Sequence, residues 1–148
     1  MPRKVSVAPG RSKYLQDITV GPHKLQADEP SDVGGGEAAP TPYELLLAAL
    51  GACTSITVQM YAERRRWPLE GVHVELSYAK VHADDCASCD TEVRTIERIE
   101  REISLLGDLS EEQRQRLMDI ADKCPLHRTL TSQIEIRTRQ TAGVKRGM

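Results

Sequence analysis

The sequence predicts a single domain that mixes strands with one long helix. Three observations lead there: two short alternating segments around a Gly-Pro turn near the N-terminus, a long apolar segment with helical signals over residues 41–66, and a period-two apolar pattern over residues 72–78. The chain has 148 residues, of which 39% are hydrophobic. That length suits one domain, residues 1–148, with its own core. Because aromatic residues make up only 3% of the chain, we expect an aliphatic core.

The N-terminal part is predicted to hold a hairpin and a loop. Residues 14–20 and 23–27 should form the two strands of the hairpin, since a Gly-Pro turn separates them. Residues 28–40 contain two prolines and three consecutive glycines, which predicts a flexible loop. Residues 1–10 are expected to be a flexible tail.

Strong helix-start signals follow this loop. Thr41, Pro42 and Glu44 fit an N-cap, a first helical residue and a capping-box partner, and the apolar pattern continues to about Arg66. A Trp-Pro pair then closes the helix. Because Leu, Ala, Ile and Val occupy nearly all faces of this helix, we expect it to be central and buried.

Strands are expected again in the second half of the chain. Apolar and polar residues alternate over 72–78, and residues 132–138 are predicted to form a last strand. Residues 91–106 are ambiguous. Their apolar residues keep a helical spacing, which favours a helix, whereas their isoleucines and threonines suit a strand.

Two C-terminal helices complete the predicted elements. Ser110, with Gln113 three residues later, opens an amphipathic helix over residues 110–123. Pro125 allows a short helix after it. Residues 140–148 are expected to be a flexible tail.

The charge distribution argues against several classes of partner. The formal net charge is −2, and basic and acidic residues are interspersed, so we expect no nucleic-acid or anionic-membrane binding. The most apolar stretch, residues 45–60, is interrupted by small and polar residues, which suits a core helix better than a membrane span. The N-terminus lacks the apolar segment of a signal peptide. We therefore expect a cytoplasmic protein, whose four cysteines are reactive or metal-binding rather than a disulfide framework.

Cys53 and Cys124 are the candidate catalytic residues. Cys53 lies within the long apolar helix, and Cys124 directly precedes a proline, where a helix start favours a thiolate. A sulfenic acid formed on one cysteine can condense with a second thiol to give a disulfide, so two cysteines suffice for a peroxide-reducing site. Cys53 alone on an apolar helix would more often be an inert core residue.

A second group of candidate residues is formed by His82, Cys86 and Cys89, with Asp84 and Asp90 beside them. A Cys-x-x-Cys pair with a nearby histidine can bind zinc or act as a local redox pair. A structural zinc site needs four ligands, which this segment supplies only if an aspartate joins. The third alternative is that these thiols have no role.

Two motifs give the chain a family resemblance. Pro-Tyr-Glu-Leu-Leu-Leu-Ala-Ala-Leu-Gly-Ala-Cys-Thr around Cys53, preceded by a Gly-rich loop, and Ala-Asp-Lys-Cys-Pro-Leu-His around Cys124 resemble the OsmC/Ohr family of bacterial thiol-dependent peroxidases. The likeness covers roughly residues 23–136. It implies an α+β fold of OsmC type, in which curved antiparallel sheets surround a long central helix bearing a cysteine. It also implies a strand, not a helix, for residues 91–106.

The resemblance also implies an activity. Family members reduce organic hydroperoxides, with the residue at Cys53 as the peroxidatic cysteine and the residue at Cys124 as the resolving cysteine. A dithiol reductant, such as a dihydrolipoyl protein, restores the thiols. The family acts as an intertwined homodimer, and the resemblance implies neither a cofactor nor a metal. On the helix, Ala49, Leu50 and Ile56, with Thr57, would offer Cys53 an apolar wall suited to an alkyl chain.

The sequence departs from the family pattern at two positions. Family peroxidases carry a carboxylate directly after the proline that opens the helix, where this chain has Tyr43, and Glu44 one place later is either catalytic or only a helix cap. No residue matches the family arginine either, and Arg11, Lys24 and Arg128 are the nearest candidates. Without an arginine at Cys53, the alternative is a non-catalytic protein that binds small molecules in the apolar dimer cleft, followed by a zinc-binding module.

Overall fold

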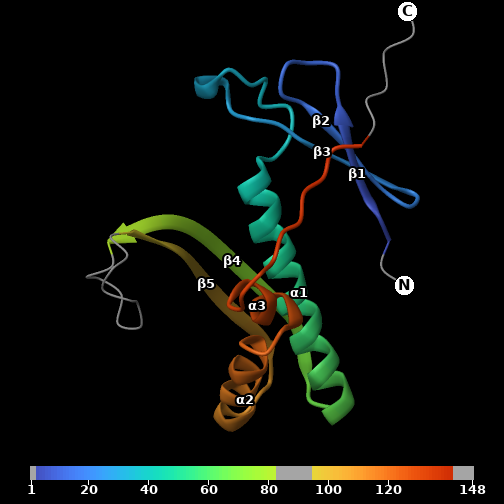
Figure 1. Cartoon of the computed structure of the whole chain (residues 1–148). Helices are drawn as coiled ribbons and strands as arrows, with labels where there is room; N and C mark the ends of the chain where they lie inside the picture. The colour runs from blue at the N-terminus through green and yellow to red at the C-terminus, as the bar shows by residue number, and fades with distance from the viewer. Residues whose placement is uncertain (1–2, 83–94, 142–148) are drawn as a thin grey trace, which may run out of the picture.

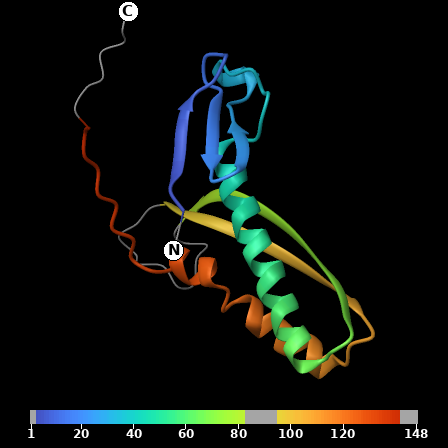
Figure 2. The same ribbon diagram turned by 90° about the vertical axis from the view of Figure 1, so that its right-hand side faces the viewer.

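The computed structural model describes residues 3–82 and 95–141. Its central element is a 24-residue helix, α1 (Pro42–Arg65). A three-stranded sheet lies at the N-terminal end of α1, and a long two-stranded sheet runs along one side of it (Figures 1 and 2). Both sheets are antiparallel, so the fold is α+β, as the resemblance implies.

The N-terminal sheet contains the predicted hairpin and one strand more. β2 (Gln16–Val20) and β3 (His23–Ala27) pair around a turn in which Gly21 has a φ of 58°, a conformation that favours glycine. The prediction of a flexible tail over residues 1–10 is wrong for β1 (Val5–Pro9), which pairs with β2. Apolar and polar residues alternate in β1, and its Val5 and Val7 lie opposite Val20 and Ile18 of β2.

The loop between β3 and α1 is closed at its base by Asp28, which is 1% exposed. Its carboxylate accepts hydrogen bonds from the backbone N–H groups of Glu29 and Ala38, and its own N–H donates to the Pro40 carbonyl. A 3-10 turn, Ser31–Val33, interrupts the predicted loop. Asp28 thus holds the two ends of the loop together just before α1 begins.

Helix α1 begins as predicted. The Thr41 hydroxyl accepts from the Glu44 N–H at 3.2 Å, and the Glu44 carboxylate accepts from the Thr41 N–H at 2.9 Å. The helix ends at Arg66, whose φ of 58° is left-handed. A Cβ on Gly51 would lie 2.8 Å from the Leu76 side chain, so glycine permits the close approach of α1 to β4 (Leu69–His82).

The prediction that α1 is buried on nearly all faces is wrong for the single chain. Only one face is buried; it is formed by Leu50, Gly51, Thr54, Val58 and Ala62. Other apolar side chains of the helix remain exposed, among them Ile56 at 56% and Met60 at 50%. The reason is geometric: β4, α2 and α3 pack against α1, and no other element of residues 3–82 and 95–141 covers it to a similar extent. By length and composition alone, α1 would also be long and apolar enough to cross a membrane.

The two-stranded sheet consists of β4 and β5 (Thr95–Gly107). The strand predicted over residues 72–78 is confirmed, and so is the strand that the resemblance implies over 91–106, of which residues 95–106 are described. The helical spacing of the apolar residues was misleading. Ile99 and Ile103 lie on the more buried side of β5, but Leu106 is 44% exposed.

The C-terminal part contains α2 (Glu111–Ala121) and α3 (Pro125–Leu130). Ser110 and Gln113 form the predicted capping box of α2. The strand predicted over residues 132–138 is wrong for this chain, because this segment is exposed and no described strand pairs with it. It extends away from α3 and lies apart from both α1 and the N-terminal sheet (Figure 2).

The core lies where the C-terminal half of α1 meets α2. It is built from small and aliphatic residues, as the composition predicts; its buried members are Val58, Ala62, Leu109, Leu117 and Ala121. Tyr61 and Trp67 pack against this cluster edge to face, with ring centroids 5.6 Å apart.

Leu117→Ala should destabilise the protein by about 2–5 kcal/mol, because Leu117 is fully buried and the substitution leaves a cavity. Leu106→Ala, at a position that is 44% exposed, should cost less than about 1 kcal/mol. Urea unfolding of both variants at one protein concentration checks the difference. Equal losses would show that the core is not centred on α2.

Candidate active site

The structure brings the segments of Cys53 and Cys124 together. Thr54, the residue after Cys53, contacts the Cys124 sulfur although the two residues are 70 positions apart in the sequence. Cys53 lies on the middle of α1 and is half-buried, whereas Cys124 caps α3 and is fully buried. The Cys53 side chain is near enough to lower the pKa of the Cys124 thiol, and both thiols are free. Two neighbouring free thiols are the starting point for a disulfide between them.

Three further groups surround the Cys124 sulfur. The His127 backbone N–H donates to it at 3.3 Å, and the Thr54 hydroxyl lies 3.9 Å away. Burial raises the pKa of the Cys124 thiol. The His127 N–H, the Cys53 and Thr54 side chains and the positive charge of Arg101 together outweigh burial, so the pKa lies below its ordinary value. These contacts therefore favour the Cys124 thiolate more than an ordinary thiol environment does.

Arg101 supplies the positive charge that sequence reasoning did not find. Its side chain is only 10% exposed. One guanidinium nitrogen, Nη1, donates to Thr54 Oγ1 at 2.9 Å, and the other, Nη2, donates to Asp122 Oδ1 at 2.9 Å and lies 3.0 Å from His127 Nδ1. These contacts connect β5, α1 and the segment that carries Cys124. Because Arg101 and Asp122 form an ion pair, the cation remains paired despite its burial.

A signal for Arg101 was present in the sequence. Arg101 alternates with Ile99 and Ile103 along the strand, so all three side chains lie on its more buried side. A charged residue is unusual there. This signal is readable only if residues 95–107 form a strand. On a helical interpretation the same arginine has no reason to be buried.

The candidates proposed for the family arginine lie elsewhere. Arg11 and Lys24 are exposed residues near the N-terminal sheet. Arg128 is exposed as well, and its backbone N–H, not its guanidinium, bonds to the carbonyl of Cys124. Glu44 serves as a helix cap, and its hydrogen bonds with the Thr41 backbone and side chain lower the pKa of its carboxyl.

A cavity of about 630 Å³ opens beside this network. Aliphatic side chains and one methionine form most of its wall: Leu46, Leu47, Leu50, Ile99, Ile103, Met118 and Leu130. Its polar lining includes Arg101, Asp122 and His127 of the network. The cysteines themselves do not line the cavity; Thr54 and His127 link them to it.

The apolar wall differs from the one predicted. Of the neighbours expected on the helix, only Leu50 lines the cavity, and Ile56 is 56% exposed on another face of α1. The difference arises because β5 and the C-terminal helices, not α1 alone, form the cavity. Like the predicted wall, the observed wall is mainly aliphatic, so it also favours apolar ligands.

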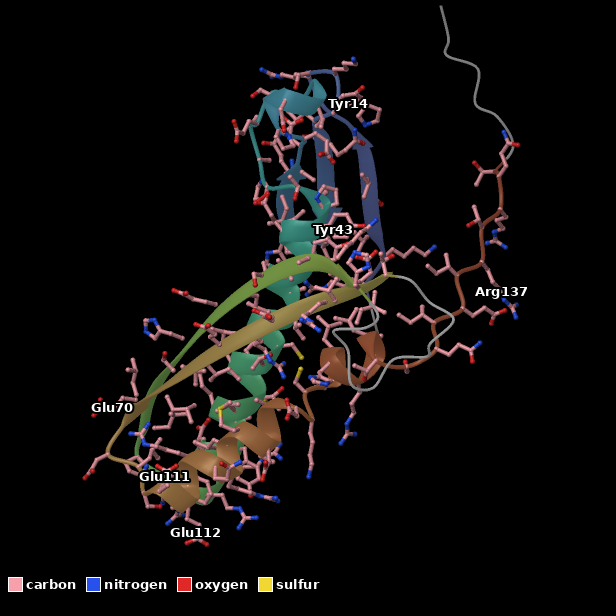
Figure 3. The ribbon with its side chains drawn as sticks, turned by 90° about the vertical axis from the view of Figure 1, so that its left-hand side faces the viewer. Tyr14, Tyr43, Glu70, Glu111, Glu112 and Arg137 are labelled. Carbon is pink, nitrogen blue, oxygen red and sulfur yellow. The ribbon has the colours of Figure 1, made fainter. Side chains whose placement is uncertain are left out.

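A second polar cluster of the cavity contains Tyr43, the residue at the family's carboxylate position. Its ring stacks on that of Tyr78, with centroids 4.7 Å apart. Figure 3 shows Tyr43 at the start of α1, where the helix passes the two-stranded sheet. The Tyr78 hydroxyl donates to the Glu97 carboxylate, and this hydrogen bond is the main cause that raises the pKa of Tyr78. A carboxylate thus reaches the cavity from β5, not from α1.

The segment with the other two cysteines lies outside the described residues, apart from His82 at the end of β4. Zinc binding, a local redox pair and the absence of a role therefore remain alternatives for Cys86 and Cys89. Within residues 3–82 and 95–141, no group of three or more His, Cys, Asp or Glu side chains is placed to hold a metal ion.

Comparison with known proteins gives consistent results. The family described as OsmC-like protein matches residues 34–139. An OsmC-like protein from Mycoplasma pneumoniae is similar in structure, with a TM-score of 0.69 and 16% identity over 88% of this chain and 87% of the other. An organic hydroperoxide resistance protein OsmC from Legionella pneumophila has a TM-score of 0.64 and 18% identity over 88% and 90%.

A third similar structure is the organic hydroperoxide resistance protein OhrB of Bacillus subtilis, with a TM-score of 0.61 and 17% identity over 88% of this chain and 91% of the other. No curated protein matches this chain. At these identities the structures show a shared fold, and the match over residues 34–139 shows the family. The chain belongs to the OsmC-like protein family.

Proposed function

We propose that this protein is a thiol-dependent peroxidase that reduces organic hydroperoxides through a Cys53 sulfenic acid and a Cys53–Cys124 disulfide. The observation that carries the proposal is the meeting of two free thiols with a largely buried guanidinium beside an apolar cavity. The names of two similar structures, both organic hydroperoxide resistance proteins, support it.

In the first step, the Cys53 thiolate attacks the terminal oxygen of the hydroperoxide. An S–O bond forms while the O–O bond breaks, which leaves a sulfenic acid on Cys53 and an alkoxide that takes a proton from water. A positive charge that is in place before reaction stabilises the developing alkoxide. Arg101 meets this need, since it is bonded to Thr54, the residue after Cys53, and borders the cavity.

In the second step, the Cys124 thiolate attacks the Cys53 sulfur. The disulfide forms, and the hydroxyl group of the sulfenic acid leaves as hydroxide, which is protonated to water. The lowered pKa of Cys124 increases the fraction of thiolate available for this step. An external dithiol, of the dihydrolipoyl type that the family resemblance implies, then reduces the disulfide.

We further propose a cytoplasmic homodimer. Apolar side chains are exposed on α1 and on the N-terminal sheet, including Ile56, Met60, Val7 and Leu25. The extended C-terminal segment adds exposed isoleucines, among them Ile136 at 84%. A second copy of the chain would cover these surfaces, which a stable monomer rarely leaves open.

Non-catalytic binding of a small apolar molecule is the second candidate. It is favoured by one observation: the cavity is lined mainly by aliphatic side chains, and neither cysteine contributes to its wall. Binding without peroxide consumption, by wild-type protein and the Cys53→Ser variant alike, would identify this function.

Cys124→Ser should stop disulfide formation and leave a sulfenic acid on Cys53 that over-oxidises with excess peroxide, because the resolving thiol is absent. The measurement is mass spectrometry of peptides after treatment with one and with ten equivalents of cumene hydroperoxide. Wild-type protein, the control, should give the Cys53–Cys124 disulfide. Oxidation confined to Cys86 and Cys89 would contradict the proposal.

Arg101→Met should lower kcat/KM for cumene hydroperoxide by about 100-fold, because the guanidinium no longer stabilises the alkoxide. Arg128→Met, the matched control at an exposed position, should change it less than about twofold. A second readout is the absorbance of the Cys124 thiolate in the Cys53→Ser variant. Because the pKa of Cys124 is lowered, this absorbance should persist below about pH 8.5, the ordinary thiol pKa, and disappear as the pH falls through the lowered pKa. Addition of Arg101→Met should move this titration to higher pH. Unchanged kinetics and titration would show that Arg101 is only structural.

The apolar cavity should favour an organic hydroperoxide over hydrogen peroxide by tens-fold in kcat/KM, since each buried methylene contributes about 0.8 kcal/mol. Leu47→Ser, which places a hydroxyl in the wall, should reduce this preference, and Leu106→Ser outside the cavity should not. The measurement compares tert-butyl hydroperoxide with hydrogen peroxide. If the wild-type protein has nearly equal kcat/KM values for the two peroxides, the cavity does not bind the substrate during the reaction.

A further inference from the structure

His127 occupies a position between the thiols, Arg101 and the cavity. Its backbone N–H bonds to the Cys124 sulfur at 3.3 Å, its ring nitrogen Nδ1 lies 3.0 Å from Arg101 Nη2, and its side chain lines the cavity. The steps described above assign no task to this ring.

The contact with Arg101 determines where the ring carries its proton. A guanidinium only donates hydrogen bonds, so His127 Nδ1 must accept. A neutral imidazole whose Nδ1 accepts carries its hydrogen on Nε2. Arg101 Nη2 also donates to Asp122 Oδ1, so the two hydrogens of this nitrogen are both engaged and its orientation is fixed. The ring therefore presents a donor at Nε2, not a base.

We propose that His127 is a further catalytic residue, whose Nε2–H donates a hydrogen bond to the substrate oxygen that becomes the alkoxide. This inference rests on the proposed peroxidase function and deepens it. While the S–O bond to Cys53 forms and the O–O bond breaks, the leaving oxygen gains the electron pair of the broken bond. His127 keeps its proton and stabilises the negative charge as a neutral donor, and the alkoxide is protonated by water.

This role divides the work between two side chains. Three of the five N–H donors of Arg101 are directed to Thr54, Asp122 and His127, so the protein fixes the position of its positive charge. His127 adds a directed donor of its own in the wall of the cavity. The same hydrogen bond that uses Arg101 Nη2 keeps His127 in the tautomer that can donate.

Two substitutions separate donation from positioning. Asparagine at 127 places an amide oxygen near the position of Nδ1, so it can still accept from Arg101, but it has no group at the position of Nε2. Glutamine reaches the position of Nε2 with an amide N–H donor, but it does not replace Nδ1. We expect His127→Asn to lower kcat/KM for cumene hydroperoxide by about 100-fold and His127→Gln to retain most of it.

Either of two results would overturn the inference: His127→Asn with wild-type kcat/KM, or equal losses in both variants, which a purely structural role would give. Thermal unfolding of both variants reports whether a loss reflects stability. Nitrogen-15 NMR of the reduced wild-type protein, with His127 assigned by its absence in His127→Asn, provides a readout that is independent of activity. We expect the Nε2–H tautomer, and an Nδ1–H tautomer would also overturn the inference.

The two levels of the proposal fail in different ways. If the wild-type protein consumes no hydroperoxide, the peroxidase function is wrong, and the NMR experiment still tests the tautomer. If the wild-type protein is active and the Asn variant equals it, only the role of His127 is wrong.

Discussion

The burial of Arg101 is the constraint on which the site depends. A guanidinium removed from water is costly unless it is paired and hydrogen-bonded, and here a hydroxyl of α1, a carboxylate after α2 and an imidazole of α3 accept hydrogen bonds from three of its five donors. The same partners position the thiols, because Thr54 follows Cys53 and contacts Cys124, and the His127 backbone bonds to the Cys124 sulfur. One buried cation thus joins three segments of the chain and is among the groups that lower the pKa of the Cys124 thiol.

The cavity and the network form a single unit. Aliphatic side chains from α1, β5 and the C-terminal helices build the wall, and the polar network closes one part of it. This combination suits a ligand with an apolar chain and one oxygen-bearing reactive group. Much apolar surface elsewhere on α1 and the N-terminal sheet remains open in the single chain, which is why a second copy is part of the proposal.

Local signals in the sequence were sufficient for most of the fold. The capping boxes at Thr41 and Ser110 located two helix starts, and alternation located β4. Non-local features could not be predicted in the same way. The strand β5 has apolar residues at a spacing that also fits a helix, and only its pairing with β4 decides between them. The strand predicted over residues 132–138 rested on the local pattern alone, and none of the described strands pairs with this segment.

In the candidate site, too, local features were predictable from the sequence and non-local ones were not. Cys53 and Cys124 were found from their motifs, but their proximity depends on how α3 packs on α1. Arg101 was missed although the resemblance implied a strand over residues 91–106, because its partners Thr54, Asp122 and His127 come together only in the folded chain. The most direct test of the proposed function is stopped-flow reaction of the reduced protein with substoichiometric cumene hydroperoxide. The proposal predicts loss of two thiols, Cys53 and Cys124, for each peroxide consumed, and no rapid loss in Cys53→Ser. Equal rates of peroxide consumption in the two proteins would contradict it.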